Sequence, residues 1–155
     1  MGMIADLSLY LLTGIVHWWW TANLSFFGLA PNIIFIAALS AAIIARPAKA
    51  IAYCFFFGIF LDLLGANLFG AYALTYTLMA YGIYMMKRHL DLVGPFPQII
   101  AALSLTLVTM LFYQALSLAL ARINPLELKA FLVEPFLNAL LTPIVFYIFV
   151  QFKKR

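Results

Sequence analysis

The chain has 155 residues, of which 67% are hydrophobic and only 9% are charged. Soluble domains have about 45–50% apolar and about 25% charged residues, so this composition excludes a soluble globular fold. The nine Lys/Arg and five Asp/Glu give a net charge of +4. The basic residues lie at the ends of apolar segments, which is typical of a membrane protein and argues against a surface that binds nucleic acid.

Six apolar segments follow one another along the chain, and we expect each to form a helix. A backbone group left unpaired in lipid costs several kcal/mol, and the segments lack the alternating polarity of a barrel. The predicted fold is an all-α membrane protein, a compact bundle of about six transmembrane helices that forms a single domain over residues 1–155. The expected helices cover about residues 4–21, 32–45, 48–64, 69–86, 97–121 and 134–152.

The first segment ends in the tryptophans at 18–20, which favour the level of the lipid headgroups. The second has about 14 residues between Pro31 and Arg46, so as a helix it covers only about 21 Å of the ~30 Å hydrocarbon core. Small residues four apart in it allow close contact with another helix, either of this chain or of a partner. These residues are Ala38, Ala41, Ala42 and Ala45.

The third segment contains Asp62, the one ionisable residue that the sequence places well inside a span. A carboxylate in hydrocarbon costs at least ~2.5 kcal/mol, so such groups are normally paired or functional. Gly58 lies one turn earlier on the same helix face, where a glycine lets another backbone approach closely, and Gly65 and Gly70 bracket a turn. Three roles for Asp62 stay open: holding a helix N-terminus at an internal junction, coupling to a proton or ion, and reaching water at the end of its span.

The last segment combines Asn138 and Pro143. A proline inside a helix frees a carbonyl one turn back, so the pair predicts a kinked, partly polar helix that faces Asp62. An ordinary kinked membrane helix is the alternative. The connection before this segment, from Arg122 to Pro135, is expected to be the longest.

The positive charges predict an orientation. With the N-terminus in the cytoplasm, the cytoplasmic connections and tail hold seven Lys/Arg and the outer connections hold two. Because cytoplasmic loops carry the excess of basic residues, we expect both termini to be cytoplasmic. The seven are Arg46, Lys49, Lys87, Arg88, Lys153, Lys154 and Arg155, and the two are Arg122 and Lys129.

No catalytic or metal-binding pattern stands out in the sequence. We find no Ser/His/Asp or Cys/His set, no paired carboxylates, no phosphate loop and no dinucleotide fingerprint. The one cysteine, Cys54, lies in an apolar run and is expected to be a small hydrophobe in a helix. We therefore expect no enzyme activity and no cofactor.

Residues 58–65 combine a glycine, an apolar run, Asp-Leu and a second glycine, and Gly70 and Ala73-Leu74 follow. This pattern resembles the signature of the bacterial rod shape-determining MreD family. Pro31-Asn32 is similar to the Pro-Asp that opens the second span of the family, with Asn32 in place of the usual Asp. Residues 138–143 are similar to the polar Asn and later Pro of its last span. The resemblance covers nearly the whole chain in length and segment order.

The resemblance implies a non-enzymatic scaffold subunit of the cell-elongation machinery in the bacterial inner membrane. It implies binding to the transmembrane helix of the bitopic protein MreC. With MreC, the chain would support the MreB cytoskeleton and the peptidoglycan synthase pair, RodA and its class B transpeptidase. Asp62 and its glycines would shape the internal junction that keeps the binding surface in place.

A different function stays open. The fold of the family is similar to that of the substrate-binding subunits of energy-coupling-factor vitamin transporters, so such a subunit is the alternative. It would need a polar pocket near the outer face. The polar side chains available for it are Asn67, Tyr72, Gln114 and Asn124.

Overall fold

Six helices make up the described part of the computed structural model, which covers residues 3–23, 29–65, 68–120 and 128–154. This confirms the predicted all-α fold. By length and composition, α3, α5 and α6 are each able to cross a membrane. The helices are α1 (Met3–Asn23), α2 (Ile33–Ile44), α3 (Pro47–Leu64), α4 (Ala71–Met86), α5 (Pro95–Ala119) and α6 (Leu128–Lys154).

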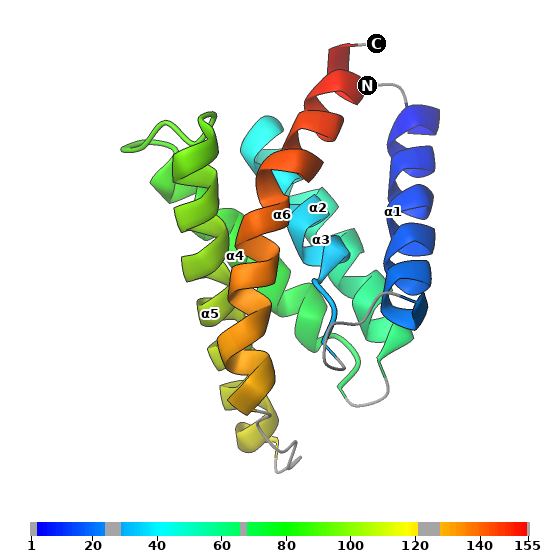
Figure 1. The fold of residues 1–155 in the computed structure, drawn as a ribbon, viewed down its shortest axis with the longest axis vertical. Coiled ribbons are helices and arrows are strands. Elements are labelled where there is room, and N and C mark those ends of the chain that lie inside the picture. Colours follow the sequence, from blue (N-terminus) through cyan, green and yellow to red (C-terminus); the bar gives the residue numbers. More distant parts are fainter. Residues whose placement is uncertain (1–2, 24–28, 66–67, 121–127, 155) are drawn as a thin grey trace.

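The helices run alternately up and down, so that their connections alternate between the two ends of the bundle (Figure 1). The end where α1 begins and α6 ends also holds the α2–α3 and α4–α5 connections. Arg46 and Lys49 lie at the start of α3, and Lys87 and Arg88 directly follow α4, so all four belong to this end. We call it the basic end. The predicted orientation requires this alternation.

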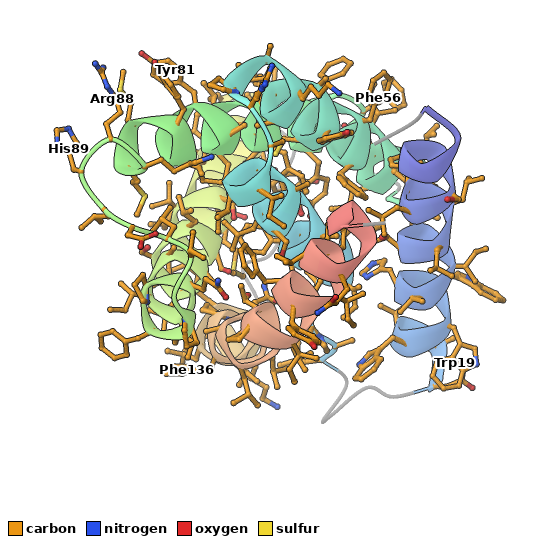
Figure 2. All side chains as sticks on the ribbon, turned by 90° about the horizontal axis from the view of Figure 1, so that it is seen from above. Trp19, Phe56, Tyr81, Arg88, His89 and Phe136 are labelled. Atoms are coloured by element: carbon orange, nitrogen blue, oxygen red, sulfur yellow. The ribbon has the colours of Figure 1, made fainter. Side chains whose placement is uncertain are left out.

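α2 lies in the middle of the bundle, with the other helices around it (Figure 2). It packs against each of the other five helices, and every residue from Ile33 to Ile43 is buried. The side chains of Trp19, Phe56 and Phe136, by contrast, point outward from the surrounding helices. Because protein covers α2, its 12 residues are sufficient here, although a lipid-exposed span needs about 20.

The small residues of α2 are used inside the bundle. Ala38 and Ala42 are 0% and 1% exposed, and Ala41 is 7% exposed, while Ala45 is partly buried at the end of the helix. Ala38 and Ala42 thus pack against helices of the chain itself, which favours the internal of the two roles that the sequence left open. Ala41 and Ala45 also line a groove at the basic end, so packing of a partner helix against these two stays a prediction.

Side chains hold both ends of this short helix. At its start, Asn32 Oδ1 accepts a hydrogen bond from the backbone N–H of Phe35 at 3.0 Å. At its end, Lys87 Nζ donates to the carbonyl oxygens of Ile43 and Ala45 at 2.7 and 3.3 Å. The last carbonyls of a helix have no partner within it, and a cation there also interacts favourably with the helix dipole. Lys87 thus ties the end of α4 to the end of α2.

Replacing Lys87 tests this cap. We expect Lys87→Met to lower the free energy of unfolding by about 1.5–3 kcal/mol, the usual contribution of a hydrogen bond to a charged group. The melting temperature of the purified chain in detergent measures the loss. Arg88→Gln is the control, because Arg88 is an exposed neighbour of the same charge. If both variants melt together, or if Lys87→Met melts like the unaltered chain, the capping role is wrong.

α6 begins earlier than predicted, at Leu128 instead of about Glu134. The charges and the proline before Asn138 favoured a connection up to Pro135. In the structure Pro135 lies inside α6 and is buried. Membrane helices tolerate an internal proline, because neighbouring groups compensate the backbone groups that it frees. The earlier start places Glu134 inside the helix instead of at its beginning.

Candidate functional site

Asp62 forms a junction between α3 and α4. Its side chain is 5% exposed, and Oδ1 and Oδ2 accept hydrogen bonds from the backbone N–H groups of Tyr72 and Ala73, each at 3.0 Å. These N–H groups belong to the first turn of α4, where they have no partner in their own helix. A negative charge at a helix N-terminus is also favourable. The geometry is thus that of an internal junction, the first of the three roles weighed for this residue.

Gly58 allows the two helices to approach each other at this junction. A Cβ at position 58 would lie 2.4 Å from the Cα of Ala73, and 2.6 Å from both Ala73 N and Tyr72 O. These are backbone atoms, which cannot turn aside as the end of a side chain can. Gly58 and Asp62, one turn apart on α3, therefore meet the same two residues of α4.

The two other glycines of the motif differ from each other. Gly70 directly precedes α4 and has a φ of +92°, a left-handed conformation that is costly for any residue with a Cβ. Gly65 directly follows α3 with a φ of −93°, which other residues adopt readily. The backbone thus requires glycine at Gly70, and its left-handed turn sets the direction in which α4 starts.

A second polar group, around Asn138 of α6, joins several helices. Asn138 is fully buried; its Oδ1 accepts a hydrogen bond from the backbone N–H of Asn32 at 2.8 Å, and its Nδ2 donates to Thr106 Oγ1 of α5 at 3.4 Å. Asn32 Nδ2 in turn donates to the hydroxyl of Tyr76 of α4 at 3.4 Å. Asn138 therefore holds the start of α2, whereas the sequence predicted that it faces Asp62.

Pro143 lies inside α6, five residues after Asn138. The hydroxyl of Thr142, next to it, donates to the carbonyl oxygen of Asn138 at 2.6 Å. This part of α6 is partly polar, as the sequence predicts. Its polar side chains contact the chain's own helices.

A cavity of about 150 Å³ lies beside Asn138. Glu134, one turn before Asn138, lines it and interacts with the Asn138 side chain. Besides Asp62, Glu134 is thus a second acid within a helix that is able to cross a membrane. Its spacing of four residues from Asn138 was the available signal, since residues four apart share a helix face.

Tyr72 connects the junction to this cavity. Its backbone N–H binds Asp62, and its side chain lines the cavity. Its ring stacks on that of Tyr113 of α5, with ring centroids 4.4 Å apart. The junction and the cavity thus form one polar centre that reaches α2, α3, α4, α5 and α6. No group of three or more His, Cys, Asp or Glu within the described ranges could hold a metal ion.

Comparison with known proteins identifies the family of this chain. The family model described as rod shape-determining protein MreD matches residues 2–153, nearly the whole chain. The chain belongs to the MreD family. This confirms the resemblance that the Asp62 motif carries, and it makes the chain a membrane protein involved in rod shape determination. No curated protein and no solved structure matches the chain.

The residues that carry the MreD resemblance coincide with the polar centre. Gly58, Asp62 and Gly70 build the α3–α4 junction. Asn32 and Asn138 hydrogen-bond each other at the start of α2. The Asn32 side chain both caps α2 and donates to Tyr76. A carboxylate at this position could cap the helix but has no N–H to donate.

Proposed function

We propose that this MreD chain is a non-enzymatic scaffold subunit of the cell-elongation machinery in the bacterial inner membrane. It binds the transmembrane helix of MreC, and with MreC it supports MreB and the RodA–class B transpeptidase pair in peptidoglycan synthesis. In this proposal the basic end of the bundle, with both termini, lies in the cytoplasm. The family match and the seven-to-two distribution of Lys/Arg support it.

The engagement of Asp62 carries this proposal. Both of its carboxylate oxygens accept hydrogen bonds from the start of α4. Hydrogen bonds with an ionised acceptor are about twice as strong as neutral ones, so the acid fixes α4 against α3. An acid used in this way supports a structural role better than ion transport, which needs a carboxylate that exchanges its partners.

The outer surface of the bundle suits a partner helix. Large apolar side chains are exposed on it, such as Phe55 and Phe56 of α3 and Leu74 and Leu78 of α4. Lipid provides no hydrophobic drive between helices, so association depends on packing and on a few hydrogen bonds of about 1 kcal/mol each. Packing requires a surface of fixed shape, and the polar centre supplies that by fixing the helices behind it.

Coexpression with MreC tests the proposal. We expect the affinity-tagged chain to recover MreC from detergent extracts, and Asp62→Ala to recover less MreC and to give wider cells. Asp91→Ala is the matched control, because Asp91 is exposed and accepts a local bond from the Val93 N–H. Normal MreC recovery together with normal cell width in Asp62→Ala cells would argue strongly against the proposal.

A second candidate function, a vitamin-binding subunit of an energy-coupling-factor transporter, needs a polar pocket, and the cavity beside Asn138 is polar. Tyr72 and Gln114 line the cavity, while Asn67 and Asn124 lie outside the described residues. Pockets for small organic ligands have volumes of about 300–1,000 Å³, and this cavity has about 150 Å³. The size suits a few water molecules better than a vitamin, so we favour the scaffold. Saturable binding of a vitamin to the purified chain would reverse this choice.

A further inference from the structure

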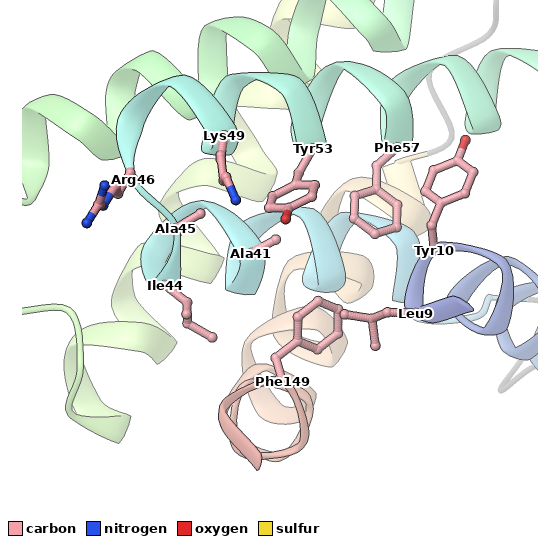
Figure 3. A pocket seen from close by; sticks show the side chains of 10 residues that line it. All are labelled: Leu9, Tyr10, Ala41, Ile44, Ala45, Arg46, Lys49, Tyr53, Phe57 and Phe149. Atoms are coloured by element: carbon pink, nitrogen blue, oxygen red, sulfur yellow. The ribbon is translucent and has the colours of Figure 1, made fainter. Parts of the chain in front are cut away.

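A second, larger cavity lies at the basic end of the bundle, away from the polar centre. It is a groove of about 330 Å³, within the range of pockets that hold organic ligands. Helices α1, α2, α3 and α6 all contribute to its walls (Figure 3). The α3–α4 junction does not use it.

The groove is basic at one end and apolar at the other. Lys49, Tyr53 and Phe57 stand in a row along α3, with Arg46 at the basic end (Figure 3). The three residues of the row are four apart, so they share one face of the helix. From Lys49 to Phe57 the helix rises about 12 Å, and over that distance the wall changes from cationic to hydrocarbon. Such a gradient matches a molecule with a charged head and an apolar tail.

Small residues leave the space of the groove open, and contacts between α1 and α3 fix its apolar end. Ala41 of α2 and Ala45, which directly follows α2, line the groove, where larger side chains would fill it. At the apolar end, the hydroxyl of Tyr10 of α1 donates to the carbonyl oxygen of Phe56 at 2.8 Å. The Tyr10 ring also packs on that of Phe57, with centroids 5.2 Å apart. These contacts hold α1 against α3 and keep this end of the groove in place.

The two cations at the open end are available to a ligand. Arg46 and Lys49 are exposed, and neither forms an ion pair or a side-chain hydrogen bond with any side chain that the structure describes. Lys87, at the same end, differs from them because its ammonium group caps α2. Two uncommitted cations beside an apolar groove are complementary in charge to an anionic amphiphile.

We propose that this groove binds an anionic phospholipid. The headgroup phosphate lies at Arg46 and Lys49, and one acyl chain follows Tyr53 and Phe57 toward Phe149. Arg holds phosphate through paired N–H donors, and Lys adds a point charge. Basic pockets between transmembrane helices on the cytoplasmic side are suited to anionic lipid headgroups. Because the walls come from α1, α2, α3 and α6, the bound lipid joins α1 to the rest of the bundle.

Native mass spectrometry of the full chain in detergent tests this site. The probes are phosphatidylglycerol and phosphatidylcholine with identical acyl chains, added in equal amounts. We expect the chain to retain phosphatidylglycerol in preference to phosphatidylcholine. Arg46→Gln and Lys49→Gln should each weaken phosphatidylglycerol binding about fivefold, the factor expected for one basic residue near an anionic lipid. Ala45→Leu should reduce the binding of both lipids, because it fills the groove without changing the charge.

Arg88→Gln is the control for charge, since it removes a cation from the same end but outside the groove. It should leave lipid binding unchanged, and the melting temperature of each variant shows that the fold persists. Equal retention of the two lipids, or full phosphatidylglycerol binding by Arg46→Gln and Lys49→Gln, would overturn the proposal. So would an Ala45→Leu variant that loses MreC recovery but keeps its lipid, since the groove would then be a docking site for a helix.

Discussion

A single methyl group at Gly58 is expected to separate α3 from α4. In Gly58→Ala the new Cβ would lie 2.4 Å from the Cα of Ala73, a distance that two carbons do not tolerate. Backbone lines both sides of the contact, so one helix must move, and the Asp62 hydrogen bonds to Tyr72 and Ala73 lengthen with it. Overpacking alone costs about 1–3 kcal/mol, and weakening the hydrogen bonds adds to that. We expect a loss of at least about 3 kcal/mol in the free energy of unfolding.

The measurement is the yield and the melting temperature of the chain in detergent. Gly82→Ala is the matched control, because Gly82 lies within α4 and a Cβ there meets nothing within 4 Å. Alanine is the better helix former by about 1 kcal/mol, so this control should melt at the same temperature as the unaltered chain or slightly higher. If Gly58→Ala behaves like Gly82→Ala, the close approach of the two helices is wrong.

Removing the carboxylate has the second large effect. In Asp62→Ala the N–H groups of Tyr72 and Ala73 lose their acceptors in a buried place. Each buried donor without a partner costs about 1–3 kcal/mol, so we expect a loss of about 2–6 kcal/mol in the free energy of unfolding. Asp62→Asn should lose less, because its amide keeps one acceptor oxygen.

Chemical unfolding of the three proteins in the same detergent measures this order. The stability should fall from Asp62 to Asn to Ala, while Asp91→Ala, in an exposed connection, should change it little. A stable Asp62→Ala variant would mean that water or another group serves the start of α4 equally well. The junction would then not depend on the acid.

The position of the junction on α3 was predictable from the sequence, but its partners on α4 were not. A single acid in an apolar segment, with glycine one turn earlier, is visible because lipid makes a charge costly. The groups that Asp62 binds are the backbone N–H groups of Tyr72 and Ala73. Every residue except proline carries such a group, so no side-chain pattern points to these two.

The place of α2 could not be predicted for a related reason. In a soluble protein, polar residues mark the face of a helix that meets water. In a membrane protein, the lipid face and the core face are both apolar. The stripe from Ala38 to Ala45 is therefore equally compatible with internal and external packing, and only the structure shows α2 surrounded by the other helices. Only the short length of the segment indicated that α2 is surrounded by protein, because a lipid-exposed span needs about 20 residues.

Glu134 shows how an uncertain helix boundary hides a side chain that lines a cavity. Its charge and the following Pro135 favour a connection, because both are rare within membrane helices. In the structure α6 continues through both residues, and Glu134 lines the cavity beside Asn138. A prediction from sequence assigns each residue the free-energy cost that it has when it faces lipid. In the structure, polar side chains of the chain surround Glu134 and reduce that cost.

Amide hydrogen exchange at the start of α4 tests whether Asp62 holds this helix in place through its backbone N–H groups. The first N–H groups of a helix lack partners within it, so strong protection at Tyr72 and Ala73 requires an acceptor from elsewhere. We expect these two amides to exchange slowly in the unaltered chain and much faster in Asp62→Ala, while amides in the middle of α5 stay protected in both. Fast exchange at Tyr72 and Ala73 in the unaltered chain, or equal protection in the two proteins, would mean that Asp62 does not hold the start of α4.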